Sequence, residues 1–330
     1  MSATMTMVEA INLALHDSME SDETILVLGE DVADTEGGGV VGITKGLSTR
    51  FGVERVRSTP ISEQAIIGAA IGESLIGFKP VAEIMLMNFT TVASDMIVNH
   101  AAKLRFMSGG QTSVPIVIRT MTGAGFGNGG QHSDYLEAWF AHIAGLKVVL
   151  ASNPADAYGL MLSCIDDPDP CIFVETLPAL FTPGPGADRG KKIPIGKAKI
   201  VREGRDVSII AYGRIVQAIA GLADKLSGEG LSIELLDLRT VSPLDMDGIL
   251  ASVDKTGAAI VVHEAVKKFG PGAEICSAIY EALFDRLRAP VIRLGARYAP
   301  VPFSQPLETA SLPSLDEVEA AVRRLAPKPN

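Results

Sequence analysis

The chain has few cysteines, few aromatic residues and no excess of positive charge. Its three cysteines, Cys164, Cys171 and Cys276, are odd in number and form no CxxC pair, so neither a disulfide framework nor a zinc site is expected. They are instead predicted to be reduced and mostly buried thiols. Asp and Glu outnumber Lys and Arg by 39 to 29, and the net charge of −10 argues against nucleic acid as a partner, because phosphate binding needs clustered basic residues.

Long hydrophobic runs and targeting signals are also absent. No apolar run approaches the ~18 residues that a membrane-spanning helix needs, so we expect no membrane partner. The first residues lack a basic segment ahead of an apolar one. They carry acidic side chains that argue against a transit peptide, namely Glu9, Asp17, Glu20, Asp22 and Glu23. We therefore expect a cytoplasmic protein.

The composition that is present predicts a well-packed α/β protein. Hydrophobic residues make up 47% and charged residues 21% of the chain, which is ordinary for a well-cored protein. A length of 330 residues is more than a single hydrophobic core usually needs, so two domains are expected. Short apolar strand patterns alternate with helical patterns, which predicts mainly parallel sheets covered by helices on both faces. Prolines and glycines cluster between residues 177 and 192. We therefore predict a domain over residues 1–180, a linker over 181–195 and a smaller α/β domain over 196–330.

Residues 59–72 combine a helix start with a run of small apolar residues. Ser62 is a favourable N-cap, and Glu63 falls in the first helical turn. We expect this helix to be buried, with Gly68 and Gly72 allowing another backbone to approach closely. A buried carboxylate must meet a partner or hold a proton. Glu63 is therefore either an acid that the helix dipole favours or a desolvated acid directed at a ligand nitrogen.

A glycine-rich stretch follows the predicted strand over residues 115–121. Gly125, Gly127 and Gly130 satisfy GxGxxG, but the acidic residue of a dinucleotide site is missing from the end of the next strand. Conformational freedom beside a ligand explains these glycines better than NAD binding does. The stretch leads to His132, placed where α/β proteins bind ligands, so His132 is a catalytic candidate. The remaining histidines are expected to be structural: His16, His100, His142 and His263.

Taken together, these segments resemble the beta subunit of the decarboxylating component of 2-oxo acid dehydrogenase complexes. Members of that family depend on thiamine diphosphate and act on pyruvate, branched-chain 2-oxo acids or acetoin. The order and spacing of the shared motifs fit along nearly the whole chain. These motifs are Gly29-Glu30-Asp31-Val32, Thr59 to Glu63, Glu83 to Phe89, Ala101-Ala102-Lys103, Met107 to Gly110, Gln131-His132-Ser133, Gly145 to Val149 and Pro194 to Ala198.

The resemblance implies a role for each of four residues. Glu63 would bond the aminopyrimidine ring of the cofactor, Phe89 would pack against that ring, and Glu30 would lie near it. His132 would assist transfer of the acyl group to a lipoyl arm on the acyltransferase. The two domains would be a thiamine pyrimidine-binding domain and a transketolase C-terminal-like domain, the latter for dimerisation and docking to the core of the complex.

The resemblance also implies metal sites and a partner. A potassium ion would be held by backbone carbonyls at Ile116, Cys164, Ile165, Asp167 and Asp169. Magnesium on the cofactor diphosphate usually needs a Gly-Asp-Gly motif, which this chain lacks. In the family that half of the site belongs to an alpha subunit, so the resemblance implies a heterotetramer of two alpha and two beta subunits. Its further partner would be the lipoyl-bearing dihydrolipoyl acyltransferase.

Two alternative functions stay open. A non-catalytic scaffold subunit would not need Glu63, Phe89 and His132 together. A split transketolase would need basic residues for a sugar phosphate, and Arg119 alone gives it little support. Within the favoured family the substrate also stays open, since residues 37–47 and 118–121 are most similar to acetoin dehydrogenases and residues 263–265 to branched-chain enzymes.

Overall fold

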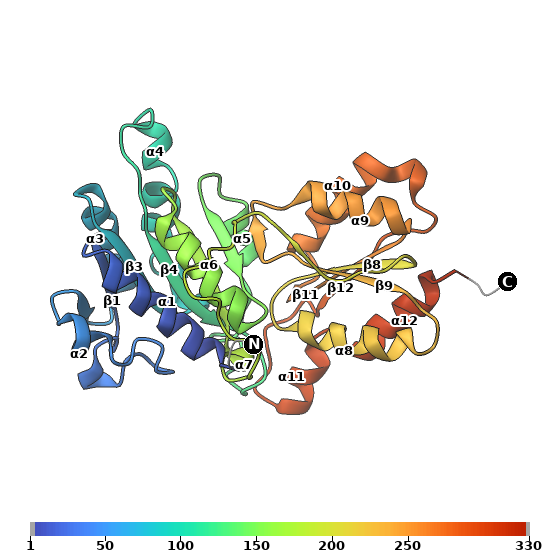
Figure 1. The fold of residues 1–330 in the computed structure, drawn as a ribbon, viewed down its shortest axis with the longest axis horizontal. Coiled ribbons are helices and arrows are strands. Elements are labelled where there is room, and N and C mark those ends of the chain that lie inside the picture. The colour runs from blue at the N-terminus through green and yellow to red at the C-terminus, as the bar shows by residue number, and fades with distance from the viewer. Residues whose placement is uncertain (1–3, 328–330) are drawn as a thin grey trace.

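Residues 4–327 are described in the computed structural model, which has two α/β lobes lying side by side (Figure 1). The first lobe is built on a seven-stranded sheet in the order β10-β5-β6-β4-β3-β1-β2. Its strands are β1 Ile25–Gly29, β2 Val56–Ser58, β3 Lys79–Leu86, β4 Val117–Thr122, β5 Lys147–Leu150, β6 Cys171–Thr176 and β10 Thr240–Ser242. The first six run parallel to one another, which confirms the predicted fold class.

The second lobe is built on a five-stranded sheet in the order β12-β11-β8-β9-β7. Its strands are β7 Lys199–Arg202, β8 Val207–Ala211, β9 Ile233–Asp237, β11 Ala259–Val266 and β12 Ile292–Ala296. Helices α8 (Ile215–Ser227) and α12 (Leu315–Leu325) cover one face. Helices α9 (Met246–Thr256) and α10 (Pro271–Leu283) cover the other. Ser314, directly before an apolar helical pattern, is a plausible N-cap in the sequence, and in the structure it caps α12 and forms a capping box with Glu317.

Strand β10 joins the two lobes. It follows the second lobe's β9 in the chain but pairs antiparallel with β5 of the first sheet, with Thr240 opposite Val149 and Ser242 opposite Val148. The segment over 196–330 therefore supplies an edge strand to the first sheet. One buried apolar cluster also runs through both lobes, from Ile84 of β3 to Val261 of β11. The two lobes consequently share a core.

Both faces of the first sheet are covered. Helices α1 (Met7–Ser21) and α6 (Pro154–Asp166) pack on one face. Helix α3 (Glu63–Leu75) and the π-helix over Met96–Ala101 pack on the other. The Asn153 side chain caps α6 by accepting a hydrogen bond from the backbone N–H of Asp156, as Ser, Asp and Asn do at helix starts. The remaining helices are short: α2 Leu47–Phe51, α4 Leu104–Met107, α5 Glu137–Ala141, α7 Leu177–Leu180 and α11 Gln305–Ser311.

Three local predictions differ from the structure. The sequence over residues 91–106 predicts a single helix, but the end of a 3-10 turn, the π-helix and α4 stand there in succession. Helix α3 is buried on one side only, and Ala65, Ala69 and Gly72 are exposed. No other backbone approaches Gly72, while Gly68 faces the Met96 side chain. An apolar sequence alone cannot tell which part of a helix its own chain covers.

The prediction that the cysteines are reduced and buried is confirmed. The thiols of Cys164, Cys171 and Cys276 are free, and all three are buried. Within residues 4–327, no helix is both long and apolar enough to cross a membrane.

Candidate active site

The four residues singled out from the sequence follow four neighbouring strands. His132 comes after β4, Phe89 after β3, Glu30 after β1 and Glu63 after β2, and the sheet order is β4-β3-β1-β2. These strands are parallel, so their carboxyl ends meet at one edge of the sheet, where α/β proteins place ligand sites. The fold therefore gathers the candidate residues along one edge.

Glu63 is the first residue of α3 and is half-buried. Ser62 occupies the N-cap position, but its hydroxyl donates to the carbonyl of Pro60 at 3.1 Å and does not cap the helix. Within residues 4–327 the Glu63 carboxylate has no hydrogen bond and no ion pair. The described residues therefore supply no partner for this carboxylate, which leaves it available to a ligand.

Glu30 lies close enough to Glu63 for their charges to interact. The backbone N–H of Thr59 donates to the carbonyl of Gly29 at 2.9 Å, which ties the segment before α3 to the end of β1. Burial raises the pKa of the Glu30 carboxyl above its ordinary value, and the negative charges of Glu63, Asp31 and Glu83 raise it further. Glu30 and Glu63 thus form a pair of mutually repelling acids that favours a ligand able to donate a hydrogen bond.

Phe89 and His132 are in direct contact. Their ring centroids are 5.4 Å apart and the rings are inclined at 76°, an edge-to-face arrangement. The Nδ1 atom of His132 is buried and has no hydrogen-bond partner. Buried polar atoms are rarely left unpaired, so a hydrogen-bonding group of a ligand is one partner that would satisfy this nitrogen.

An ion triad lies beneath this edge and was not predicted. Arg119 of β4 is 1% exposed, and its Nη1 atom donates to Oε2 of Glu83 on β3 at 2.6 Å. Its Nε and Nη2 atoms donate to the two carboxylate oxygens of Glu175 on β6 at 2.7 and 3.0 Å. Burial raises the pKa of Glu175 to about 7 against the opposing effect of Arg119. Charges inside otherwise apolar strands are the sequence signal that could have revealed it.

The expected potassium positions also lie together, at the opposite end of the sheet. The carbonyl of Ile116 accepts from the N–H of Cys171 at 3.0 Å, and that of Cys164 accepts from the N–H of Asp167 at 3.3 Å. Lys147 places its ammonium 2.5 Å from Asp167 and 3.4 Å from Asp169. Among the described residues no three His, Cys, Asp or Glu side chains form a metal cluster. A carbonyl site is of a different kind, so potassium stays a prediction.

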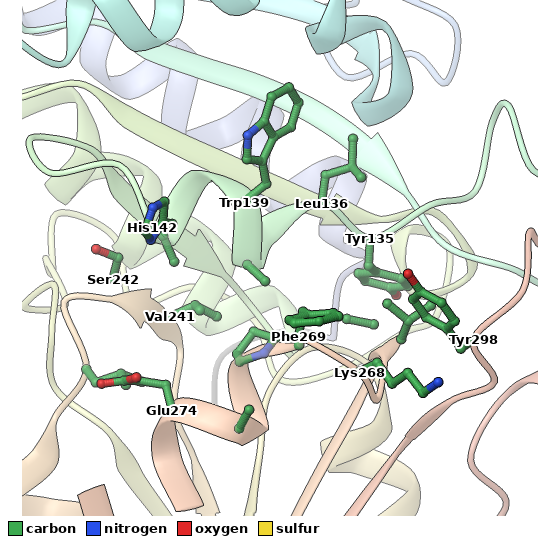
Figure 2. Close-up of a pocket in the computed structure, with 18 of the residues that line it drawn as sticks. Tyr135, Leu136, Trp139, His142, Val241, Ser242, Lys268, Phe269, Glu274 and Tyr298 are labelled. Atoms are coloured by element: carbon green, nitrogen blue, oxygen red, sulfur yellow. The ribbon is translucent and has the colours of Figure 1, made fainter. Parts of the chain in front are cut away.

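A separate hollow of about 1010 Å³ lies between α5 and the second lobe (Figure 2). Trp139 and His142 line it from α5, whereas Phe269, Glu274 and Tyr298 line it from the second lobe. None of the four candidate residues lines it. This hollow is therefore distinct from the edge that carries the acids and His132.

Comparisons with known proteins agree with the two-lobed fold. Residues 3–181 match the family described as transketolase, pyrimidine binding domain, and residues 196–318 match transketolase, C-terminal domain. A solved structure titled split gene transketolase, inactive beta4 tetramer, superposes with a TM-score of 0.78 over 98% of both chains. Its sequence identity is 21%, which supports the fold alone.

Relatives with higher sequence identity indicate which group of transketolase-like proteins the chain belongs to. The beta-2 subunit of the pyruvate dehydrogenase E1 component from Oryza sativa subsp. japonica is 42% identical over 97% of this chain and 86% of its own. The beta subunit of acetoin:2,6-dichlorophenolindophenol oxidoreductase from Cupriavidus necator is 42% identical over 96% and 95%. The corresponding pyruvate dehydrogenase subunit from Acholeplasma laidlawii is 42% identical over 98% of both. The chain therefore belongs to the beta subunits of thiamine-dependent 2-oxo acid and acetoin dehydrogenases.

The residues present fit the cofactor of that family. The Glu63 carboxylate has no partner among the described residues, Glu30 has a raised pKa, and His132, in contact with Phe89, has an unpartnered buried nitrogen; all follow strands whose carboxyl ends lie at one edge of the sheet. A ligand with a hydrogen-bonding aromatic ring would satisfy this set.

Proposed function

We propose that this chain works with an alpha subunit as the decarboxylating component of a thiamine-diphosphate-dependent 2-oxo acid or acetoin dehydrogenase. The observation that carries the proposal is the placement of Glu63, Glu30, Phe89 and His132 on the carboxyl ends of four neighbouring strands. A scaffold subunit would not need this set, and all four residues are in place.

Three residues would hold the pyrimidine half of the cofactor. Glu63 would bond a ring nitrogen, Phe89 would pack against the ring, and Glu30 would keep the surroundings acidic. Thiamine diphosphate, when bound, supplies a nucleophilic carbon for attack on the substrate carbonyl. The chain's own contribution is to shield the Glu63 carboxylate from water and to hold a proton between it and the ring nitrogen. The diphosphate and its magnesium would be held by the alpha subunit in an α2β2 assembly.

His132 would act in the second half of the reaction. The lipoyl ring of the acyltransferase must take up a proton as its disulfide opens, and an imidazole suits proton delivery near neutral pH. Contact with Phe89 fixes the plane of the imidazole and leaves Nδ1 free. This gives a dehydrogenase of the oxidoreductase class with a disulfide acceptor.

A sugar-phosphate substrate finds no support at Arg119. Its guanidinium is occupied by Glu83 and Glu175 and is closed to solvent, so it cannot meet a phosphate. The potassium ion and the cytoplasmic location stay predictions.

The decisive experiment is a dye-reduction assay on the chain co-purified with its alpha subunit. Pyruvate, branched-chain 2-oxo acids and acetoin would be compared at equal concentrations, with and without thiamine diphosphate and magnesium. We expect cofactor-dependent reduction with at least one of them. Activity with none of the three, from a pair that assembles, would contradict the proposed function.

A further inference from the structure

The glycine-rich loop before His132 is held by the second lobe. The backbone N–H of Gly125 donates to Oε1 of Glu308 at 2.7 Å. The N–H of Gly127 donates to both oxygens of the same carboxylate, at 3.3 and 3.2 Å. Glu308 is on α11, is 2% exposed, and lies near the positive charge of Arg214. Two backbone N–H groups of the loop thus share one buried carboxylate, which joins the loop directly to α11.

Phe303, which precedes α11, also packs closely against the loop. A Cβ atom added to Gly129 would lie 2.4 Å from the ring of Phe303, and Gly129 has a φ of +74°. A Cβ on Gly127 would lie 3.2 Å from the carbonyl of Phe303. Glycine is therefore required where the loop meets Phe303. Phe303 and Glu308 thus contact the loop at every second residue, namely Gly125, Gly127 and Gly129.

The far end of the loop is tied to the segment that carries Phe89. Asn88 donates from Nδ2 to the carbonyl of Gly130 at 3.1 Å and to Asp134 at 2.9 Å. Its Oδ1 atom accepts the backbone N–H of Asp134 at 3.2 Å. A cavity of about 100 Å³, lined in part by Ser133, lies behind this stretch, so packing alone does not immobilise it. His132 lies between the two residues that Asn88 contacts, Gly130 and Asp134, and Glu308 holds the part of the loop that precedes them.

We propose that Glu308 is a positioning residue, which fixes the glycine-rich loop so that His132 stays against Phe89. The second lobe would then take part in the active site as well as in dimerisation and docking. The consequence for acyl transfer depends on the proposed function, whereas the effect on the loop does not. Gly125 is exposed, so without Glu308 its N–H can turn to water and the loop gains conformational freedom while the fold persists.

The first test measures the loop in the purified full chain, without any activity. Hydrogen exchange of the peptide over residues 122–135 would be compared in the parent, Glu308→Gln and Glu308→Ala. Glu281→Gln, an exposed carboxylate on α10, is the matched control. We expect exchange to rise about tenfold or more in Glu308→Ala, and less in Glu308→Gln because the amide keeps one acceptor oxygen. Parent-like exchange in both Glu308 variants would overturn the proposal.

The second test follows His132 itself. Its modification by diethyl pyrocarbonate would be read by mass spectrometry against exposed His142 in the same digest. In the assembled pair, acylation of a lipoyl domain should fall more than dye reduction in Glu308→Ala, with partial recovery in Glu308→Gln. If Glu308→Ala loosened the loop but kept the parent's ratio of lipoyl acylation to dye reduction, the positioning role would be overturned. An inactive parent pair would contradict the proposed function alone, and the exchange result would still stand.

Discussion

The edge of the Phe89 ring meets the imidazole of His132 at a centroid distance of 5.4 Å. The two side chains come from the ends of neighbouring strands, β3 and β4. The Phe89 ring lies against the imidazole, and among the described residues the buried Nδ1 atom has no hydrogen-bond partner. One residue proposed to pack on the cofactor thus orients the residue proposed to deliver a proton.

Replacement of His132 by Ala should separate the two half-reactions. In the proposed function, decarboxylation would depend mainly on the cofactor and Glu63, whereas opening of the lipoyl disulfide needs a proton. We expect acylation of a lipoyl domain to fall by ~10-fold or more relative to dye-coupled decarboxylation. Both assays run on one preparation, so partial misfolding does not change the ratio. His142→Ala, an exposed histidine on the same lobe, is the control.

Other outcomes at His132 have clear meanings. Equal losses in both reactions would mean that the imidazole acts earlier, in substrate binding or in the first step. Parent-like rates in both would make His132 a structural residue at the end of a glycine-rich loop.

Glu63→Gln should abolish cofactor-dependent dye reduction while leaving the fold intact. The carboxylate has no partner within residues 4–327, so an amide of the same shape removes no internal contact. Loss of an essential acid–base group typically costs ~10²–10⁴-fold in rate. Thermal melting of the variant should match that of the parent and of Glu23→Gln, an exposed control. Activity within a few-fold of the parent would mean that Glu63 is only an acid favoured by the helix dipole and not a catalytic group.

The chain alone should bind thiamine diphosphate weakly or not at all. Its sequence contains no Gly-Asp-Gly motif for the magnesium that bridges the diphosphate. Calorimetric titration with magnesium present should show little heat until the alpha subunit is added. Tight binding by the chain without a partner would rule out a site shared between two subunits.

The sequence predicts most of the fold because its local signals agree. The alternating strand and helix patterns match the observed elements, and the favourable cap residues Asn153 and Ser314 do stand at the helix starts of α6 and α12. Strand β10 is different, since three residues carry no pattern that tells which of two sheets they join. Pairing with β5 is decided by the tertiary structure.

The site is predictable in part for a related reason. Glu63, Phe89 and His132 lie in motifs whose order could be matched to a family. Glu308 lies in a short helix with no distinctive spacing, and its partners are backbone N–H groups far away in the chain. Almost every residue has a backbone N–H group, so a hydrogen bond to the backbone does not require a particular residue type and cannot be recognised in the sequence. Only the folded structure places Glu308 beside the loop.

Arg119→Met should destabilise the protein strongly. It would leave the carboxylates of Glu83 and Glu175 buried without their positive partner, which typically costs about 3–5 kcal/mol. The triple variant Arg119→Met, Glu83→Gln, Glu175→Gln should recover much of that loss, because no buried charge remains. The free energy of unfolding in urea measures both. Arg50→Met, which breaks an exposed pair with Glu20, should cost less than about 1 kcal/mol.

Glu137→Gln should change how stability depends on pH. Glu137 begins α5, is fully buried, and accepts a hydrogen bond at Oε1 from the Tyr212 hydroxyl at 2.7 Å. Its Oε2 atom has no partner. Burial raises the pKa of the Glu137 carboxyl from 4.5 to about 7. The folded state therefore binds this proton more tightly than the unfolded state, and the stabilisation is complete below pH 4.5 and lost as the pH rises through 7.

An amide imitates the protonated carboxyl at every pH and keeps the acceptor for Tyr212. The variant and the parent should thus be equally stable near pH 4.5, while at pH 8 the variant should be more stable by about 3 kcal/mol. Urea unfolding at both pH values measures the difference, with exposed Glu281→Gln expected to show no such dependence. Other groups that titrate in this range, such as Glu175 and His263, are common to both proteins and cancel in the comparison. A difference that is the same at pH 4.5 and pH 8 would mean that Glu137 carries the same charge in the folded and unfolded states.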